Sequence, residues 1–269
     1  MTVAALVLGA GSGTRFRASL GEAGARVAVL GGDGRPDPLQ LGGPEYPGGV
    51  ELFKALVLLA GHSLLARSLA VMAAAPEVDR VVAVLPAGAL PHWPCLEKEV
   101  TQLQPGERRK LAPPVVGGAQ RQDSVQRGLA SLPEGTTHVV VHDAARPLLR
   151  AQQVGAVLAE ARRSGAALLA VPVRDTLKRV DRQGRVCETV ERSDCWAAQT
   201  PQAFRLDWLR RALLGAAAAG VVGTDDAALV ARIGLPVRVV EGDARNFKIT
   251  TWEDLELAEA WLRRREGRP

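Results

Sequence analysis

Short apolar runs alternate with amphipathic stretches along most of this chain. A short apolar run bounded by turn residues is typical of a buried strand, and apolar residues that recur every three or four positions are typical of a helix. Strands are predicted over residues 3–8, 80–85, 114–116, 138–142, 166–173 and 237–240, and helices over residues 63–75, 120–132, 152–163, 207–219 and after the Thr251–Asp254 capping box. The alternation predicts an α/β fold with a mainly parallel sheet flanked by helices, in a single domain over residues 1–269.

Two segments break this alternation. Residues 17–50 are rich in glycine, contain four prolines and show little periodicity, so a mobile loop insert is predicted there. Residues 174–200 contain two strand-like runs on either side of a polar turn at residues 181–184, which predicts a projecting hairpin arm.

A glycine-rich turn, Gly9-Ala10-Gly11-Ser12-Gly13-Thr14-Arg15, follows the first predicted strand directly. Its glycines let backbone N–H groups gather around an anion, and Arg15 supplies positive charge. It matches neither the dinucleotide fingerprint nor the P-loop. The turn resembles the nucleotide-binding loop of nucleotidyltransferases that act on sugar phosphates, and an ordinary strand-to-helix turn is the alternative.

The segments that follow the other predicted strands carry similar chemistry. In open α/β sheets the ligand lies beyond the carboxyl ends of the strands, so these segments are candidate walls of one site. Arginine or lysine occurs in most of them, which predicts an anionic ligand. The segments are residues 9–15, 117–124, 143–147, 174–176 and 246–248.

Composition narrows the class of protein. The chain is 47% hydrophobic, carries a formal charge of +5 and lacks a basic run interleaved with aromatic residues, so a nucleic-acid partner is not expected. The three cysteines and four histidines show no metal-ligand spacing, and neither a disulfide framework nor a protein-built metal cage is expected. The first apolar run is too short for a membrane span, and a cytoplasmic location is expected.

Several separate motifs then carry one specific resemblance. The chain resembles the 2-C-methyl-D-erythritol 4-phosphate cytidylyltransferases, in order along nearly its whole length except the insert. The matching motifs are Val141-His142-Asp143-Ala144-Ala145-Arg146-Pro147, Pro172 to Lys178, Gln199-Thr200-Pro201-Gln202 and Gly117-Gly118 through Ser124.

The resemblance implies a Rossmann-like fold of the nucleotide-diphospho-sugar transferase type and a reaction of CTP with a polyol phosphate in non-mevalonate isoprenoid synthesis. It also implies Mg²⁺, held mainly by the CTP phosphates with Asp143 nearby. A sister enzyme that uses another polyol phosphate, such as ribitol 5-phosphate, and a non-catalytic nucleotide-binding relative are the alternatives.

The resemblance also assigns roles to residues. The catalytic cations are Arg15, Lys54 and Lys248, and Lys54 stands beyond the insert in a chain with only five lysines. Residues expected at the nucleotide are Ala10, Gly11, Gly13, Gly118, Arg121, Ser124, Asp143 and Ala144.

The acceptor phosphate is expected at the arm residues Thr176 and Arg192, together with Thr200 and Thr224. In the family the arm crosses to a second subunit, which implies a homodimer whose arm residues act in trans. Three positions depart from the family pattern, because Ala119 and Glu191 replace aspartate and Arg245 replaces an acidic residue.

Overall fold

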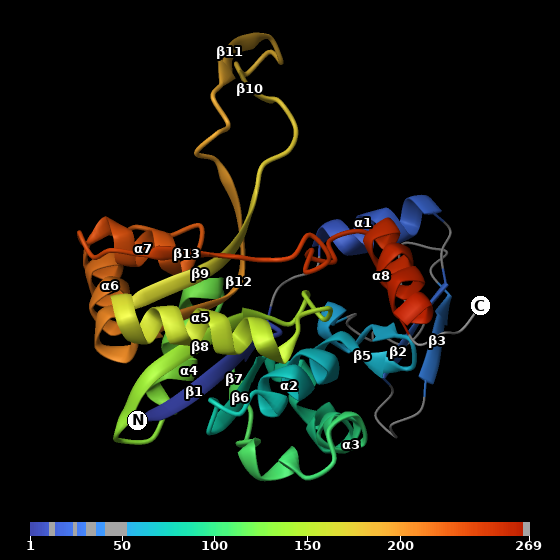
Figure 1. The fold of residues 1–269 in the computed structure, drawn as a ribbon. Helices are drawn as coiled ribbons and strands as arrows, with labels where there is room; N and C mark the ends of the chain where they lie inside the picture. Colours follow the sequence, from blue (N-terminus) through green and yellow to red (C-terminus); the bar gives the residue numbers. More distant parts are fainter. Residues whose placement is uncertain (11–13, 24–25, 31–35, 41–52, 266–269) are drawn as a thin grey trace.

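The computed structural model describes residues 1–10, 14–23, 26–30, 36–40 and 53–265. A seven-stranded sheet lies at its centre, in the order β13-β9-β12-β8-β1-β6-β7 (Figure 1). Its strands are β1 (Thr2–Leu8), β6 (Arg80–Leu85), β7 (Val115–Val116), β8 (Thr136–Asp143), β9 (Ala166–Pro172), β12 (Trp196–Arg205) and β13 (Arg238–Glu241).

The sheet is mainly parallel, as the alternation predicts. β1 pairs in parallel with β6 and β8, β6 with β7, and β13 with β9. The exception is β12, which lies antiparallel between β8 and β9. Every strand predicted for this sheet is present, whereas β12 was not predicted.

Helices cover both faces of the sheet. The described helices are α1 (Thr14–Ala23), α2 (Leu64–Ala74), α3 (Trp93–Leu103), α4 (Arg121–Ala130), α5 (Ala151–Ser164), α6 (Leu206–Ala218), α7 (Asp226–Arg232) and α8 (Trp252–Arg265). The described residues also form short 3₁₀ turns, which are η1 (Lys54–Leu56), η2 (Ala87–His92) and η3 (Glu107–Lys110). The sequence patterns predicted α2, α4, α5, α6 and α8 but not α1, α3 or α7.

Successive side chains of a strand point to opposite faces of the sheet, so the sheet has a separate apolar core on each face. In β1, Val3, Ala5 and Val7 pack with α2, α3 and α5 on one face. Ala4, Leu6 and Leu8 pack with α4, α6 and α7 on the other. Because both faces are covered, β1 is apolar throughout, and its Ala4 to Val7 segment is fully buried.

The expectation of a loop over residues 17–50 is wrong for the part of that segment that the structure describes. α1 begins at Thr14, and β2 (Arg26–Leu30) pairs antiparallel with β3 (Pro36–Gln40). Val29 is buried in a third apolar cluster that also contains Phe16, Ile249 and residues of α8. This packing supplies burial that the Gly- and Pro-rich composition does not indicate. Residues 24–25, 31–35 and 41–50 lie outside the described residues.

The predicted arm is present. β10 (Leu177–Val180) and β11 (Val186–Val190) pair antiparallel, joined by a turn in which Gly184 has φ +80° and donates its N–H to the Asp181 carbonyl. Figure 1 shows the hairpin extending away from the sheet beyond β9 and β12. Within the described residues, no helix is both long and apolar enough to cross a membrane.

Candidate active site

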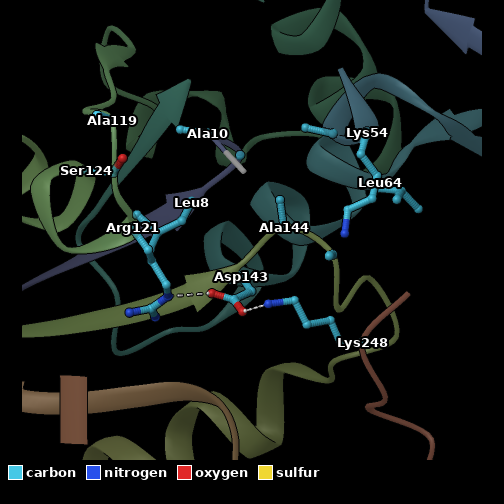
Figure 2. Close-up of a pocket in the computed structure, with 13 residues that line it drawn as sticks. Leu8, Ala10, Lys54, Leu64, Ala119, Arg121, Ser124, Asp143, Ala144 and Lys248 are labelled. Carbon is cyan, nitrogen blue, oxygen red and sulfur yellow. Dashed lines mark hydrogen bonds and ion pairs between the residues drawn. The ribbon is translucent and has the colours of Figure 1, made fainter. Parts of the chain in front are cut away.

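A pocket of about 330 Å³ opens at the carboxyl ends of β1, β7 and β8. The register of the sheet creates it, since Leu8 of β1 lies directly opposite Asp143 of β8 and the chain leaves the sheet at both positions. The pocket is lined by Leu8, Gly9, Ala10, Lys54, Ala55, Leu64, Ala119, Arg121, Ser124, Asp143, Ala144, Ala145 and Lys248 (Figure 2). The expectation that segments following separate strands meet in one place is thus confirmed for the segments that begin at residues 9, 117, 143 and 246, whereas residues 174–176 do not line this pocket.

Backbone hydrogen bonds fix the pocket floor. The N–H of Gly9 donates to Val84 O at 2.8 Å, and the N–H of Ala144 donates to Leu8 O at 3.0 Å. At Gly117 a Cβ would lie only 2.6 Å from the Cβ of Ala10, so any larger residue would push apart two walls of the pocket. The glycines therefore allow these backbone segments to pack closely together.

Asp143 is the centre of the charged network in the pocket. Its Oδ1 accepts from Arg121 Nε at 3.2 Å, and its Oδ2 accepts from Lys248 Nζ at 2.7 Å. Burial alone would raise the pKa of Asp143, but the charges of Arg121 and Lys248 outweigh burial and hold the pKa far below its usual range. Asp143 is therefore a carboxylate at every physiological pH, and it orients both cations.

Arg121 is held by a second carboxylate below the pocket. Its Nη1 lies 2.8 Å from Asp226 Oδ2, and the Asp226 side chain is only 1% exposed. Burial opposes the charge on Arg121, but the two carboxylates outweigh burial and raise its pKa. The guanidinium is therefore a permanent cation with a fixed orientation, and its Nη2 atom is buried with no hydrogen-bond partner among the residues that the structure describes.

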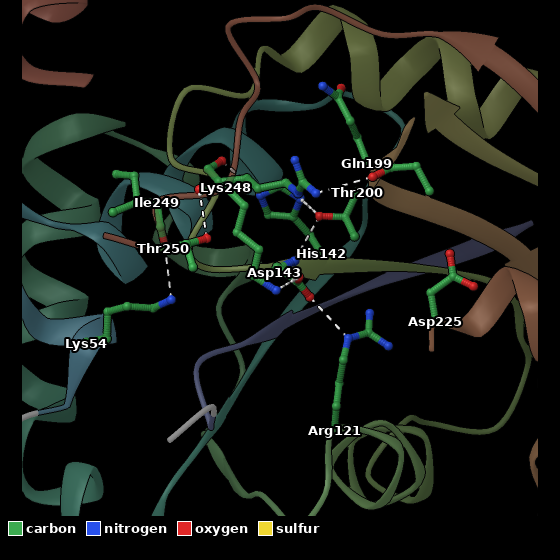
Figure 3. Close-up of polar contacts among 12 residues, drawn as sticks. Lys54, Arg121, His142, Asp143, Gln199, Thr200, Asp225, Lys248, Ile249 and Thr250 are labelled. Atoms are coloured by element: carbon green, nitrogen blue, oxygen red, sulfur yellow. Dashed lines mark hydrogen bonds and ion pairs between the residues drawn. The ribbon is translucent and has the colours of Figure 1, made fainter. Parts of the chain in front are cut away.

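Lys54 projects into the pocket from η1, opposite Arg121. Its Nζ donates to the carbonyl of Ile249 at 3.0 Å (Figure 3). Burial, followed by the nearby charge of Lys248, lowers the pKa of Lys54 to about 8. The pocket wall thus carries three cationic groups around one carboxylate, an arrangement suited to a polyanionic ligand.

A second pocket of about 270 Å³ adjoins the first and shares Arg121, Asp143 and Lys248 with it. Its other walls come from the end of β8, from β12 and from the turn before α7. They are formed by Arg146, Ala198, Gln199, Thr200, Gln202, Thr224 and Asp225. The Asp143–Lys248 ion pair therefore stands at the junction of two ligand-sized spaces.

A buried chain of hydrogen bonds sets the position of Asp143 from behind. The Asp143 N–H donates to Thr200 Oγ1 at 3.0 Å, and Thr200 Oγ1 lies 3.0 Å from Nδ1 of His142. Burial lowers the pKa of His142 to about 4, so the ring is neutral at pH 7. With the Thr200 hydroxyl donating to Nδ1, the opposite Nε2–H donates to Arg146 O at 3.2 Å. The relay joins β12 to the turn that carries Asp143.

The structure brings most of the predicted site residues together. Lys54, Lys248, Ala10, Arg121, Ser124, Asp143 and Ala144 line the first pocket, and Thr200 and Thr224 line the second. Gly118 lies behind the first pocket, where its N–H donates to Ser124 Oγ at 3.0 Å. Gly11 and Gly13 lie outside the described residues.

Besides Gly118, three described residues of the predicted site line neither pocket. Arg15 is exposed in the first turn of α1, although its positive charge contributes to the lowered pKa of Lys54. Thr176 and Arg192 are exposed in the arm segment, and the Arg192 guanidinium donates to the carbonyl of Arg174.

Sequence reasoning gave no role to Arg146, His142, Asp226 or Asn246. Arg146 and His142 belong to the Val141–Pro147 motif, but the motif does not indicate what their side chains contact. Arg146 donates to Asn246 O at 2.8 Å and lines the second pocket. Asp226 follows Asp225, the N-cap of α7, and an acidic residue in a first helical turn ordinarily indicates capping alone.

The donor set around the pockets limits how a metal ion would bind. The described residues contain no cluster of three or more histidine, cysteine, aspartate or glutamate side chains. Asp143 is the one carboxylate among the described residues that line the first pocket. This fits a Mg²⁺ ion that takes most of its ligands from substrate phosphates and water.

Comparisons with known proteins agree on one family. The family model for 2-C-methyl-D-erythritol 4-phosphate cytidylyltransferase matches residues 48–264. The enzyme of that name from Desulforamulus reducens is 41% identical over 220 residues, covering 81% of this chain and 91% of the relative. The one from Pelotomaculum thermopropionicum is 44% identical over 223 residues, covering 82% and 90%. The crystal structure of the Thermus thermophilus enzyme, 38% identical, superposes with a TM-score of 0.64 over 78% of this chain and 94% of that one.

The Lys54 ammonium is expected to titrate near pH 8, because burial and the charge of Lys248 disfavour its protonated form. The measurement is ¹³C NMR of the reductively methylated protein, with the Lys54 resonance assigned by its loss in Lys54→Arg. Pyrophosphate should raise this pKa, since an anion in the pocket favours the ammonium. A Lys54 resonance that titrates near the ordinary lysine value of 10.5 would contradict the arrangement.

Proposed function

The chain belongs to the 2-C-methyl-D-erythritol 4-phosphate cytidylyltransferase family, and we propose that its two adjoining pockets bind the two substrates of that reaction. The enzyme transfers the cytidylyl group of CTP to 2-C-methyl-D-erythritol 4-phosphate, giving CDP-methylerythritol and pyrophosphate. This is a step of non-mevalonate isoprenoid biosynthesis. The observation that carries our assignment is the shared wall, because Arg121, Asp143 and Lys248 line both pockets.

The reaction requires charge stabilisation more than proton transfer. An oxygen of the acceptor phosphate bonds to the α-phosphorus of CTP while the bond from that phosphorus to the pyrophosphate oxygen breaks. A phosphate monoester has a second pKa of about 6 and is mostly a dianion at neutral pH, so it attacks without a general base. His142 is not needed as a base, because its ring is neutral and both of its nitrogens are already bonded to protein atoms. Positioning and cationic stabilisation then supply the catalysis.

The nucleotide belongs in the first pocket. Ser124 Oγ accepts from the Gly118 N–H and donates to the Gln120 carbonyl at 3.1 Å, which leaves one acceptor position on the hydroxyl. That position suits the exocyclic amine of cytosine. Ala119 lines the same wall and offers no side-chain hydrogen bond, so one polar contact of the family pattern is replaced by a methyl group.

The phosphates of CTP would meet Lys54 and Lys248. Both ammonium groups are held by protein acceptors, Lys54 by the Ile249 carbonyl and Lys248 by Asp143. Each is thus preorganised toward the place where charge develops. Arg15, exposed at the start of α1, would join them from the nucleotide-loop side.

Mg²⁺ is part of the proposal as a companion of the triphosphate. Asp143 is the residue that would hold it, and the ion would neutralise phosphate charge. The other buried carboxylate, Asp226, is already paired with Arg121 and is not needed as a metal ligand.

The acceptor belongs in the second pocket. Arg146, Lys248 and Thr224 line a space that adjoins the first pocket, so an acceptor phosphate bound there would lie beside the phosphates of CTP. Thr200 contributes less directly, because its hydroxyl already accepts from Asp143 N–H and donates to His142. We assign Thr200 to positioning the Asp143 turn.

A homodimer would complete the acceptor site through the arm. Thr176 and Arg192 lie outside their own chain's pockets, and the arm exposes Val180 at 54% and Val186 at 62%. Apolar side chains exposed on a projecting hairpin favour burial against a partner. Glu191, the departure beside Arg192, accepts hydrogen bonds from the N–H groups of Arg192 and Ser193, so it holds the local turn. A cytoplasmic location remains a prediction, made from the short first apolar run.

Variants of the two pockets should separate the two substrates. Thr224→Val is expected to raise KM for 2-C-methyl-D-erythritol 4-phosphate by about tenfold and leave KM for CTP unchanged, and Ser124→Ala is expected to do the reverse. Pyrophosphate release from CTP, Mg²⁺ and the acceptor provides the assay. If both variants raise the same KM, the division into a nucleotide pocket and an acceptor pocket is incorrect.

The arm should complement across subunits. Arg192→Ala and Lys54→Ala are each expected to be nearly inactive alone, but mixed and exchanged subunits should regain part of the activity. In a heterodimer the catalytic pocket of the Arg192→Ala subunit keeps its Lys54. The Lys54→Ala subunit supplies that pocket with an arm that carries Arg192. Fully active monomers by analytical ultracentrifugation at the assay concentration would refute the shared site.

A further inference from the structure

A third hollow, of about 270 Å³, lies apart from both substrate pockets. It is formed by the loop between β8 and α5, the turn after β13 and the C-terminal half of α8. Its walls are Leu148, Arg150, Arg245, Trp261, Leu262 and Arg264. None of these residues lines either substrate pocket, and Arg245 is one of the positions where the chain departs from its family pattern.

Three guanidinium groups face this hollow, and none of the described residues that line it is acidic. Arg245 and Arg150 are partly balanced by Asp243, at Nη2 distances of 2.8 and 3.8 Å, but both remain more than 40% exposed. Arg263, next to Arg264, pairs with Glu259 at 3.6 Å and does not line the hollow. The hollow therefore retains an excess of positive charge.

The hollow also has an apolar floor. Trp261 is 39% exposed, which is unusual for so large an apolar side chain, and Leu148 and Leu262 lie beside it. The Arg245 guanidinium lies 5.7 Å from the centroid of the Trp261 ring, in cation–π range. This contact orients Arg245 at the edge of the floor.

We propose that this hollow is a binding site for a small organic phosphate, whose phosphate contacts Arg245, Arg264 and Arg150 and whose apolar group lies on Trp261. Arginine is suited to phosphate because its planar fork donates two parallel hydrogen bonds. The volume lies just below the usual range of about 300–1,000 Å³ for ligand sites, so it admits only a small ligand. The proposal does not depend on which substrates occupy the catalytic pockets.

The site is joined to the catalytic pocket by a short, well-anchored segment. Arg245 donates its backbone N–H and Nε to Asp243 Oδ1, at 2.9 and 3.0 Å. The next residue, Asn246, is fully buried and donates to Gln199 and Thr200, and Lys248 follows two residues later. A phosphate that competes with Asp243 for Arg245 would act on the turn that leads directly to Lys248.

The test uses phenyl phosphate as the probe and the protein labelled with 5-fluorotryptophan. Trp261 is one of five tryptophans, and its ¹⁹F resonance is assigned by its loss in Trp261→Phe. Titration of the full chain should shift this resonance saturably. The Arg245→Gln/Arg264→Gln double variant should weaken the apparent affinity by at least about tenfold, the loss expected from removing charge-assisted contacts. Arg263→Gln is the matched control on the same helix and should leave the affinity unchanged.

Three outcomes would overturn the proposal. They are a Trp261 resonance that does not shift, a double variant with the affinity of Arg263→Gln while thermal unfolding shows it folded, and an equal shift by phenol or by inorganic phosphate alone. The last would show that the hollow does not recognise the two parts of the ligand together.

Discussion

One buried carboxylate, Asp143, sets the geometry of the catalytic region. It lies at the end of β8 and is held between Arg121 of α4 and Lys248 of the segment before α8. A buried ion pair is weak evidence for stability, because desolvation offsets much of the attraction. What the arrangement provides is position, since two cations from distant parts of the chain are fixed at one point where both pockets meet.

The sheet register and the surrounding hydrogen bonds make this position possible. Leu8 and Asp143 are paired partners, so the nucleotide-loop side and the Asp143 turn leave the sheet together. The His142–Thr200 relay ties that turn to the antiparallel strand β12, and Arg146 ties it to Asn246. Charged groups held rigidly in this way stabilise developing charge without reorganisation during the reaction.

The apolar runs predicted the sheet and most of the helices, because strands covered on both faces must be continuously apolar. β12 escaped prediction since it contains Gln199, Pro201 and Gln202, residues that ordinarily weaken a strand assignment. The β2–β3 pair escaped because its Gly- and Pro-rich surroundings hide a contact with α8 that only the fold supplies. Motifs located most pocket residues, but Asp226 and His142 act through partners far away in sequence, which no local pattern reveals.

The most direct test of this account is the kcat of Asp143→Asn, measured together with CTP affinity by calorimetry. If Asp143 acts by orienting Arg121 and Lys248, kcat should fall by about 10²-fold, the scale of losing one preorganised group. The Kd for CTP measured without Mg²⁺ should stay the same or fall, because a negative charge near the triphosphate has been removed. An unchanged kcat in a folded Asp143→Asn protein would contradict the central role given to this carboxylate.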